Sequence, residues 1–250
     1  MNALAAHALI APRLEFFAYA IDAALRALDE LGDRPDRQPH IFALGLYATI
    51  LELGAGALTL AQAQRYAGLP ILLRSMYEAH LDPENLLRDA DYVLNIEAND
   101  VEQQLKLIKE AHTNPHFSGA SFDPAVEEDR FTVRLDELRR SGRPPLQIKE
   151  RASRLGRAEQ LAVLYALLCL DGHNNASALA DRHFSEEGDL RVVTLFGEPY
   201  LPSLYSRIYW LILFVVNSTT ALHQAFQSGS ATAAELRHRF DANHGELRAT

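Results

Sequence analysis

Two stretches of the sequence place charged or titratable side chains inside otherwise apolar segments. The first carries Arg74, Glu78 and His80 among leucines, and the second carries Cys169 and His173 in and after a leucine-rich run. Removing an arginine, a glutamate or a histidine from water costs several kcal/mol unless partners are supplied. Arg74 and Glu78 are four residues apart, so on a helix they share a face and can pair. We therefore expect a polar cluster, which is either a structural ion pair or a functional site.

His173 is the residue of the second stretch that is best suited to proton transfer. It follows Gly172 and precedes Asn174, and at such a helix end an imidazole can face a cleft and titrate near neutral pH. The alternative is a capping residue that interacts with the helix dipole.

Residues 134–157 form a basic segment in a chain whose formal net charge is −9. The segment holds 8 of the chain's 24 arginines and lysines against 3 carboxylates. The net charge argues against wrapping of duplex DNA, whereas the local excess leaves two alternatives, a phosphate-contacting strip or a solvated face and linker. The side chains predicted to contact a ligand are Tyr165, Asn174, His80, Arg151 and Arg154.

Several classes of site are disfavoured. The sequence has no glycine-rich phosphate loop, no Gly-x-Ser-x-Gly elbow and no dinucleotide fingerprint. His80, His112 and His116 lack the spacing of zinc ligands, so we expect neither a metal nor another cofactor. Cys169 is the single cysteine, which excludes an internal disulfide, and its leucine neighbours predict a buried, inert thiol.

The same composition bears on location. No signal peptide is recognisable, and the longest apolar run, 208–216, has nine residues, about half of what a bilayer requires. We expect a cytoplasmic protein with no membrane contact.

The elements that would position the cluster are helices. With 48% hydrophobic residues, 11 prolines and 13 glycines in 250 residues, the composition favours an all-α fold. We expect a single domain over residues 1–250, built as a bundle of about seven or eight helices, with one small β-hairpin near residues 190–200 as an option. Apolar spacing and breakers predict the helices at 12–31, 40–66, 70–81, 82–112, 123–141, 156–170, 204–226 and 231–244.

Two local signals refine these helices. Asp82-Pro83 and Asp123-Pro124 each read as an N-cap followed by a proline in the first turn, so a new helix is expected at each. Gly45, Gly54 and Gly56 indicate close packing of the second helix against a neighbour.

The two polar stretches also resemble a known family. An apolar helix with Arg-x-x-x-Glu, here Arg74 and Glu78, and a later Tyr-x-x-x-Ser/Cys-x-x-x-His element, here Tyr165, Cys169 and His173, are similar to a bacterial helical family, domain of unknown function 5677. The likeness covers about residues 40–185, with the C-terminal helices at 201–244 outside it. It implies an α-helical fold and no established activity.

A looser likeness is to HEPN and abortive-infection helical proteins. Several of those are metal-independent ribonucleases that use an arginine and a histidine, often across a dimer. The Arg74-x5-His80 spacing is similar to theirs, but Ser75 replaces the usual polar amide or acid, which favours His173 over His80 as the catalytic histidine. If Arg74 faces His173, this resemblance implies cleavage of RNA without a metal. His173 would move the proton, Arg74 would stabilise the phosphate charge, and Glu78 would orient one of them.

Two functions therefore stay open. The first is a non-enzymatic binding or regulatory module, and the alternative is a HEPN-like ribonuclease in phage defence or a toxin system. The candidate partners are RNA or a small-molecule ligand, a second copy of the chain as a homodimer, and a protein encoded nearby.

Overall fold

The computed structural model describes residues 3–31, 38–113, 123–172, 179–180, 184–187, 190–193 and 201–248. These residues form nine α-helices, two short 3₁₀ turns and two strands. The helices are α1 (Ala3–Asp29), α2 (Gln38–Gln62), α3 (Leu69–Arg88), α4 (Val93–Thr113), α5 (Pro124–Arg140), α6 (Ile148–Arg154), α7 (Ala158–Gly172), α9 (Leu201–Phe226) and α10 (Ala231–Arg248). The turns are η1 (Tyr66–Gly68) and η2 (Ala90–Tyr92), and the strands are β1 (Phe184–Glu187) and β2 (Leu190–Val193).

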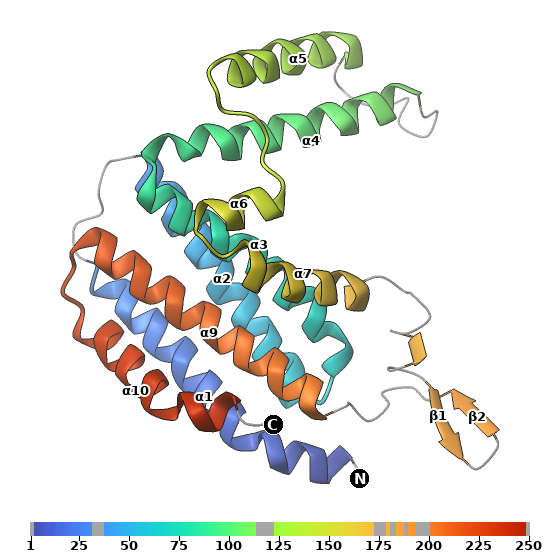
Figure 1. Cartoon of the computed structure of the whole chain (residues 1–250), viewed down its shortest axis with the longest axis vertical. Coiled ribbons are helices and arrows are strands. Elements are labelled where there is room, and N and C mark those ends of the chain that lie inside the picture. Colours follow the sequence, from blue (N-terminus) through green and yellow to red (C-terminus); the bar gives the residue numbers. More distant parts are fainter. Residues whose placement is uncertain are drawn as a thin grey trace.

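The main body is a bundle organised around α9. This helix packs against α1, α2, α3 and α10, and α3 in turn carries α6 and α7 on its other side (Figure 1). The largest fully buried side chains include Phe17, Tyr47, Tyr77 and Phe214, one from each of four helices. The Tyr47 hydroxyl stays satisfied in this core because it donates to the Ala24 carbonyl at 3.1 Å and pairs with the Thr219 hydroxyl.

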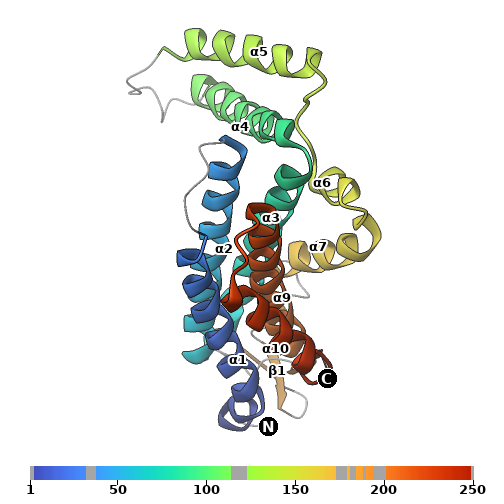
Figure 2. The ribbon, with the colours of Figure 1, turned by 90° about the vertical axis from the view of Figure 1, so that its left-hand side faces the viewer.

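Helices α4 and α5 form an arm that projects from one end of the body (Figures 1 and 2). The arm has a small core of its own, separate from the main one, made of Ala98, Val101, Leu105, Leu135 and Leu138. Arg134 of α5 joins the two helices through a two-pronged ion pair with Glu97 of α4, at 2.7 and 2.9 Å.

The packing expected at the glycines of α2 is confirmed at two of three positions. A Cβ atom on Gly54 would lie 3.5 Å from Val215, 3.6 Å from Met76 and 3.7 Å from Ile21, so three helices approach it closely. Gly56 faces Leu72 at 3.8 Å. Nothing lies within 4 Å of a Cβ on Gly45, so the prediction is wrong there.

The predicted helix start at Asp82 is wrong, whereas the start at Asp123-Pro124 is confirmed. Helix α3 runs through Pro83 without a break and ends at Arg88. The Asp82 carboxylate has side-chain partners instead of capping backbone N–H groups. The chain turns at Asp89, whose side chain accepts a bond from the Asp91 amide.

The helix count also exceeds the prediction of seven or eight. The additional element is α6, a seven-residue helix in the basic segment, between the predicted helices 123–141 and 156–170. A capping box between Gln147 and Glu150 stabilises its first turn. The prolines just before Gln147 indicated a break in helical structure, so this helix start was not predicted.

The fold is all-α apart from one short pair of strands in the part of the chain that the structure describes. Phe184 pairs with Val193 and Glu187 with Leu190, in antiparallel register. The predicted hairpin was placed near residues 190–200, so the strands lie earlier in the sequence, and only β2 falls within the predicted range.

One described helix, Pro39–Gln62, is long and apolar enough by length and composition to cross a membrane. About 33% of its most apolar window is buried, where α2 packs against α1, α3 and α9. Ile41 and Phe42 are exposed on its other side. Helix α2 contains no long unbroken apolar run, because glycine, threonine and glutamate residues interrupt its apolar sequence.

Candidate functional site

Helix α3 presents polar side chains to α6 and α7 along most of its length. Arg74, Glu78 and Asp82 follow one another at intervals of four residues, which aligns them on one face of the helix. The partners come from sequence positions 66 or more residues away on α6 and α7. The polar side chains on α3 differ in solvent exposure, and they form one partly exposed group and two buried networks.

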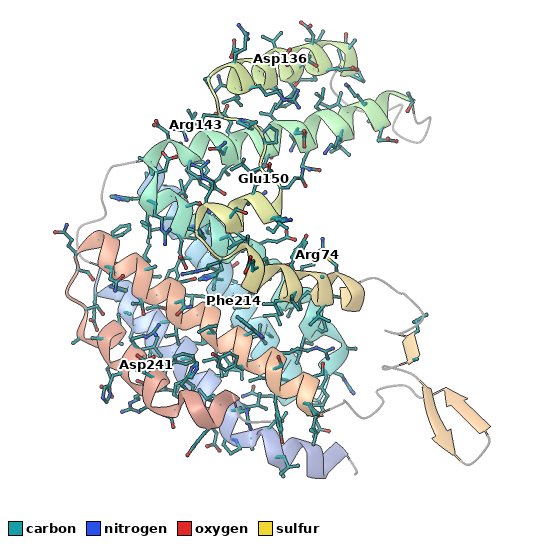
Figure 3. All side chains as sticks on the ribbon, in the orientation of Figure 1. Arg74, Asp136, Arg143, Glu150, Phe214 and Asp241 are labelled. Atoms are coloured by element: carbon teal, nitrogen blue, oxygen red, sulfur yellow. The ribbon has the colours of Figure 1, made fainter. Side chains whose placement is uncertain are left out.

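The exposed group consists of Arg74, Glu78 and Tyr165, and we call it the α3–α7 cluster. Arg74 donates from Nε to Glu78 Oε1 at 3.2 Å and from Nη2 to the Tyr165 hydroxyl at 3.2 Å. The Tyr165 hydroxyl donates in turn to Glu78 Oε1 at 3.1 Å. Three side chains from two helices thus close a ring of hydrogen bonds (Figure 3 marks Arg74 beside α7).

The α3–α7 cluster is open to solvent. The Arg74 side chain is 33% exposed and the Glu78 side chain 40%. Burial lowers the pKa of Arg74, but the bonds to Glu78 and Tyr165 outweigh that effect and raise it, so the guanidinium stays charged. Burial and the neighbouring Glu78 carboxylate raise the pKa of Tyr165, so its hydroxyl stays protonated at neutral pH. Cys169, one turn further along α7, is half-buried within electrostatic range of both.

The first buried network is centred on His80, whose side chain is 2% exposed. The ring stacks on Phe214, Nδ1 lies 2.8 Å from the Ser218 hydroxyl, and Nε2 lies 3.2 Å from Glu84. Burial lowers the His80 pKa to about 4, although the Glu84 carboxylate opposes the shift. The neutral ring has one N–H, which Nε2 donates to Glu84, and Nδ1 accepts from Ser218. Arg157 pairs with the same carboxylate at 2.7 Å.

The second buried network is centred on Asp82, whose side chain is 10% exposed. The Tyr92 hydroxyl donates to one carboxylate oxygen at 2.6 Å, and Arg151 Nη1 donates to the other at 3.1 Å. Burial raises the pKa of Asp82, and Arg151 and Tyr92 partly counteract this. The His80 network joins α3 to α9 and to Arg157 just before α7, and the Asp82 network joins α3 to α6 and η2, so both act as clamps.

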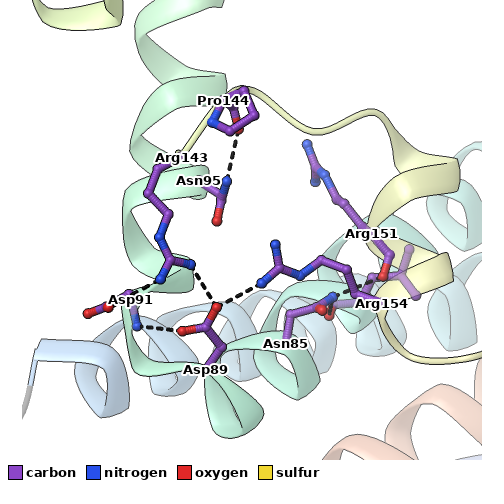
Figure 4. Close-up of polar contacts among 9 residues, drawn as sticks. Asn85, Asp89, Asp91, Asn95, Arg143, Pro144, Arg151 and Arg154 are labelled. Atoms are coloured by element: carbon purple, nitrogen blue, oxygen red, sulfur yellow. Dashed lines mark hydrogen bonds and ion pairs between the residues drawn. The ribbon is translucent and has the colours of Figure 1, made fainter. Parts of the chain in front are cut away.

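Six of the seven arginines of the basic segment pair with carboxylates, whereas Arg140 donates to the Asp136 carbonyl. Figure 4 shows Arg143 and Arg154 converging on Asp89, each at 2.7 Å, with Arg143 also on Asp91. In the same view Asn95 donates to the Pro144 carbonyl, and Asn85 to that of Arg151. The remaining pairs are Arg134 with Glu97, Arg139 with Glu102, Arg151 with Asp82 and Arg157 with Glu84. Most of the cations of the predicted phosphate-contacting strip are therefore neutralised by carboxylates of the chain itself.

The sequence-predicted residues have separate fates. Arg74, Glu78 and Tyr165 come together, but Arg74 and Glu78 are half-exposed, so the expectation of a buried ion pair there is wrong. His80 lies in the core, and Arg151 and Arg154 face carboxylates of the chain itself. The prediction that Cys169 is buried is wrong, because it is half-buried. His173 and Asn174 lie outside the described residues.

Asp82 and Glu84 are polar positions that the sequence reasoning missed. Both are less than a tenth exposed as residues and each neutralises an arginine of the basic segment. The sequence did indicate that such partners exist, because the excess of cations at 134–157 requires carboxylates elsewhere in the fold to pair with. Helix α3 and the turn after it supply several of them.

A groove between α1 and α10 and the arrangement of potential metal ligands also bear on ligand binding. A groove of about 520 Å³ lies between α1 and α10, but Arg13 there bonds the carbonyls of Glu246 and Leu247, and Arg239 pairs with Glu235. No group of three or more potential metal ligands occurs among the described residues.

Comparison with known proteins gives one match. The model of a family of unknown function, DUF5677, matches residues 40–190, a range that includes α2 to α7 and the α3–α7 cluster. No curated protein and no solved structure matches the chain.

Proposed function

The chain belongs to the family of unknown function DUF5677, and from that premise we propose that it is a binding or regulatory module whose ligand site is the α3–α7 cluster. The observation that carries the proposal is a difference in solvent exposure between the polar side chains of α3. The His80 and Asp82 networks are centred on side chains that are 2% and 10% exposed, whereas Arg74 and Glu78 are 33% and 40% exposed and keep unused hydrogen-bonding capacity that a ligand can reach from solvent.

The α3–α7 cluster contributes little to the folding stability of the protein. An ion pair as exposed as Arg74–Glu78 contributes about 0–1 kcal/mol to folding. The buried networks on the same helix already fix α3 against α6 and α7. The hydrogen-bonded ring instead orients a charged fork, a carboxylate and a phenol before any ligand arrives, which lowers the entropic cost of binding.

The alternative function is a HEPN-like, metal-independent ribonuclease in phage defence or a toxin system. Its supporting observation is the exposed guanidinium of Arg74, which could hold a phosphate. Most of the arginines that would hold the RNA backbone are instead paired with carboxylates, for example Arg143 and Arg154 with Asp89. This neutralisation favours the binding module.

Arg74→Ala separates the two functions. We expect the variant to fold normally, to lose less than about 1 kcal/mol of unfolding free energy, and to lose the rise in melting temperature that small ligands from a metabolite library give the wild type. Arg154→Ala, which removes an equally exposed pair at 36% and 32%, is the matched control and should keep the ligand response.

Two results would contradict the binding module. One is a ligand response that Arg74→Ala leaves unchanged for every compound. The other is cleavage of labelled RNA in EDTA by the wild type but not by Arg74→Ala, which would establish the ribonuclease instead.

A further inference from the structure

The α3–α7 cluster is electrically neutral, because Arg74 and Glu78 compensate each other. Arg74 uses one N–H of Nε and one of Nη2, so three of its five donors, including both on Nη1, have no partner among the described residues. Glu78 accepts both of its bonds at Oε1, and nothing in the described structure donates to Oε2. The cluster therefore offers a free donor edge and a free acceptor atom next to each other.

The surroundings add no positive field that would attract a polyanion. Two arginines that pack against α3 further along, Arg157 and Arg151, are each paired with a carboxylate, Glu84 or Asp82. The chain as a whole carries a net charge of −9. A ligand with several phosphates would meet Glu78 and this overall negative charge, while a ligand with balanced charges would not.

We propose that the ligand of the α3–α7 cluster is a small zwitterion that carries both a carboxylate and an ammonium group, as an α-amino acid does. This inference rests on the proposed function. The carboxylate takes the free Nη1–Nη2 edge of Arg74 in the two-pronged geometry that guanidinium groups favour. The ammonium group donates to Glu78 Oε2. Both free groups belong to side chains that are hydrogen-bonded to each other, so one small molecule reaches both.

The rim of the cluster also indicates what the rest of the ligand contacts. Ile71 precedes Arg74 by one helical turn and is 52% exposed, and the Tyr165 ring lies under the guanidinium at 5.4 Å. An apolar side chain on the zwitterion would cover Ile71. Leucine is therefore a suitable first probe.

Calorimetric titration of the full chain with four probes tests the charge requirement. The probes are L-leucine, 4-methylpentanoate (leucine without its ammonium group), 3-methylbutylamine (leucine without its carboxylate) and inorganic phosphate. We expect leucine to bind at least about tenfold more tightly than each of the others, because each of them lacks a charged group that accepts or donates a hydrogen bond in the cluster.

Glu78→Gln decides between a zwitterion and a simple anion, because the two ligands predict opposite signs. The substitution keeps the side-chain shape and removes the negative charge. A zwitterion site loses about tenfold or more in leucine affinity. An oxyanion site gains affinity for phosphate, since Arg74 is no longer neutralised.

Phosphate that binds more tightly than leucine, and more tightly still to Glu78→Gln, would overturn this inference and leave the proposed function standing. So would a library ligand that needs Arg74 but binds while all four probes fail. The proposed function itself fails on different results, such as binding of every ligand that Arg74→Ala leaves unchanged, or cleavage of RNA that depends on Arg74.

Discussion

Replacing Arg151 with methionine tests the distinction between clamp and site at the buried end of the same helix. Arg151 is 19% exposed and faces the carboxylate of Asp82, which is 10% exposed. Methionine retains most of the apolar stem and removes the charge. The variant leaves Asp82 in the interior with the Tyr92 hydroxyl as its remaining side-chain partner among the described residues.

The expected cost at pH 7 has a lower and an upper bound. The lost charge-assisted hydrogen bond accounts for about 1.5–3 kcal/mol. The upper bound arises because Asp82 can take up a proton instead of staying charged. Protonating a carboxyl group of ordinary pKa 3.8 at pH 7 costs about 4 kcal/mol, at about 1.36 kcal/mol per pH unit. We therefore expect a loss of about 2–4 kcal/mol in the free energy of unfolding.

The loss should shrink in acid. Burial already raises the pKa of Asp82 in the folded protein, and removing Arg151 raises it further. A carboxyl group with a raised folded pKa stabilises the fold most below its unfolded pKa, and this contribution is lost as pH rises through the folded pKa. At pH 5 the cost of protonation falls to about 1.6 kcal/mol, so the destabilisation should drop to about that value.

Urea unfolding followed by circular dichroism at pH 5 and pH 7 measures both quantities. Arg154→Met is the control on the same helix, and its pair with Asp89 is 36% and 32% exposed, so we expect a loss below about 1 kcal/mol. Adding Asp82→Asn to Arg151→Met should recover most of the stability at pH 7. A loss below 1 kcal/mol for Arg151→Met, equal at the two pH values, would refute the reasoning.

Three further outcomes are expected. Gly45→Ala should raise the free energy of unfolding by about 0.5–1 kcal/mol, since nothing lies within 4 Å of the new Cβ, and a loss would reveal a contact there. Tyr47→Phe should cost about 1–3 kcal/mol by removing the bonds to Ala24 and Thr219, and a change under 0.5 kcal/mol would contradict this. His80 should titrate near pH 4 by NMR, so stability falls as pH drops from 6.5 towards 4, and a pKa near 6.5 would show that the ring is accessible.

Much of the fold could be predicted from the sequence because helices follow local periodicity. The predicted ranges 204–226 and 231–244 correspond closely to α9 and α10. Asp82 shows the limit of local reasoning. Its Asp-Pro pair has the chemistry of a helix cap, but Arg151, 69 residues away, uses the carboxylate, and no local pattern records that partner.

The candidate site was predictable to a similar extent. The four-residue spacing of Arg74 and Glu78 predicts their contact, and the family resemblance pointed to Tyr165. The solvent exposure of Arg74 and Glu78 was not predictable, because it depends on where α7 crosses α3. The arginines of the basic segment were misleading as a strip because their partners lie 37 to 73 residues away along the chain, as in Arg134–Glu97 and Arg157–Glu84.

The most direct test of the central claim is the thermal unfolding of Arg74→Ala with and without a ligand that stabilises the wild type. The account predicts that the unliganded variant melts within about 4 °C of the wild type, as expected for a loss below about 1 kcal/mol in a chain of this size, and that the ligand no longer raises its melting temperature. A fall of more than about 8 °C without ligand, or an undiminished rise with it, would contradict the claim that the α3–α7 cluster is a binding site and not a clamp.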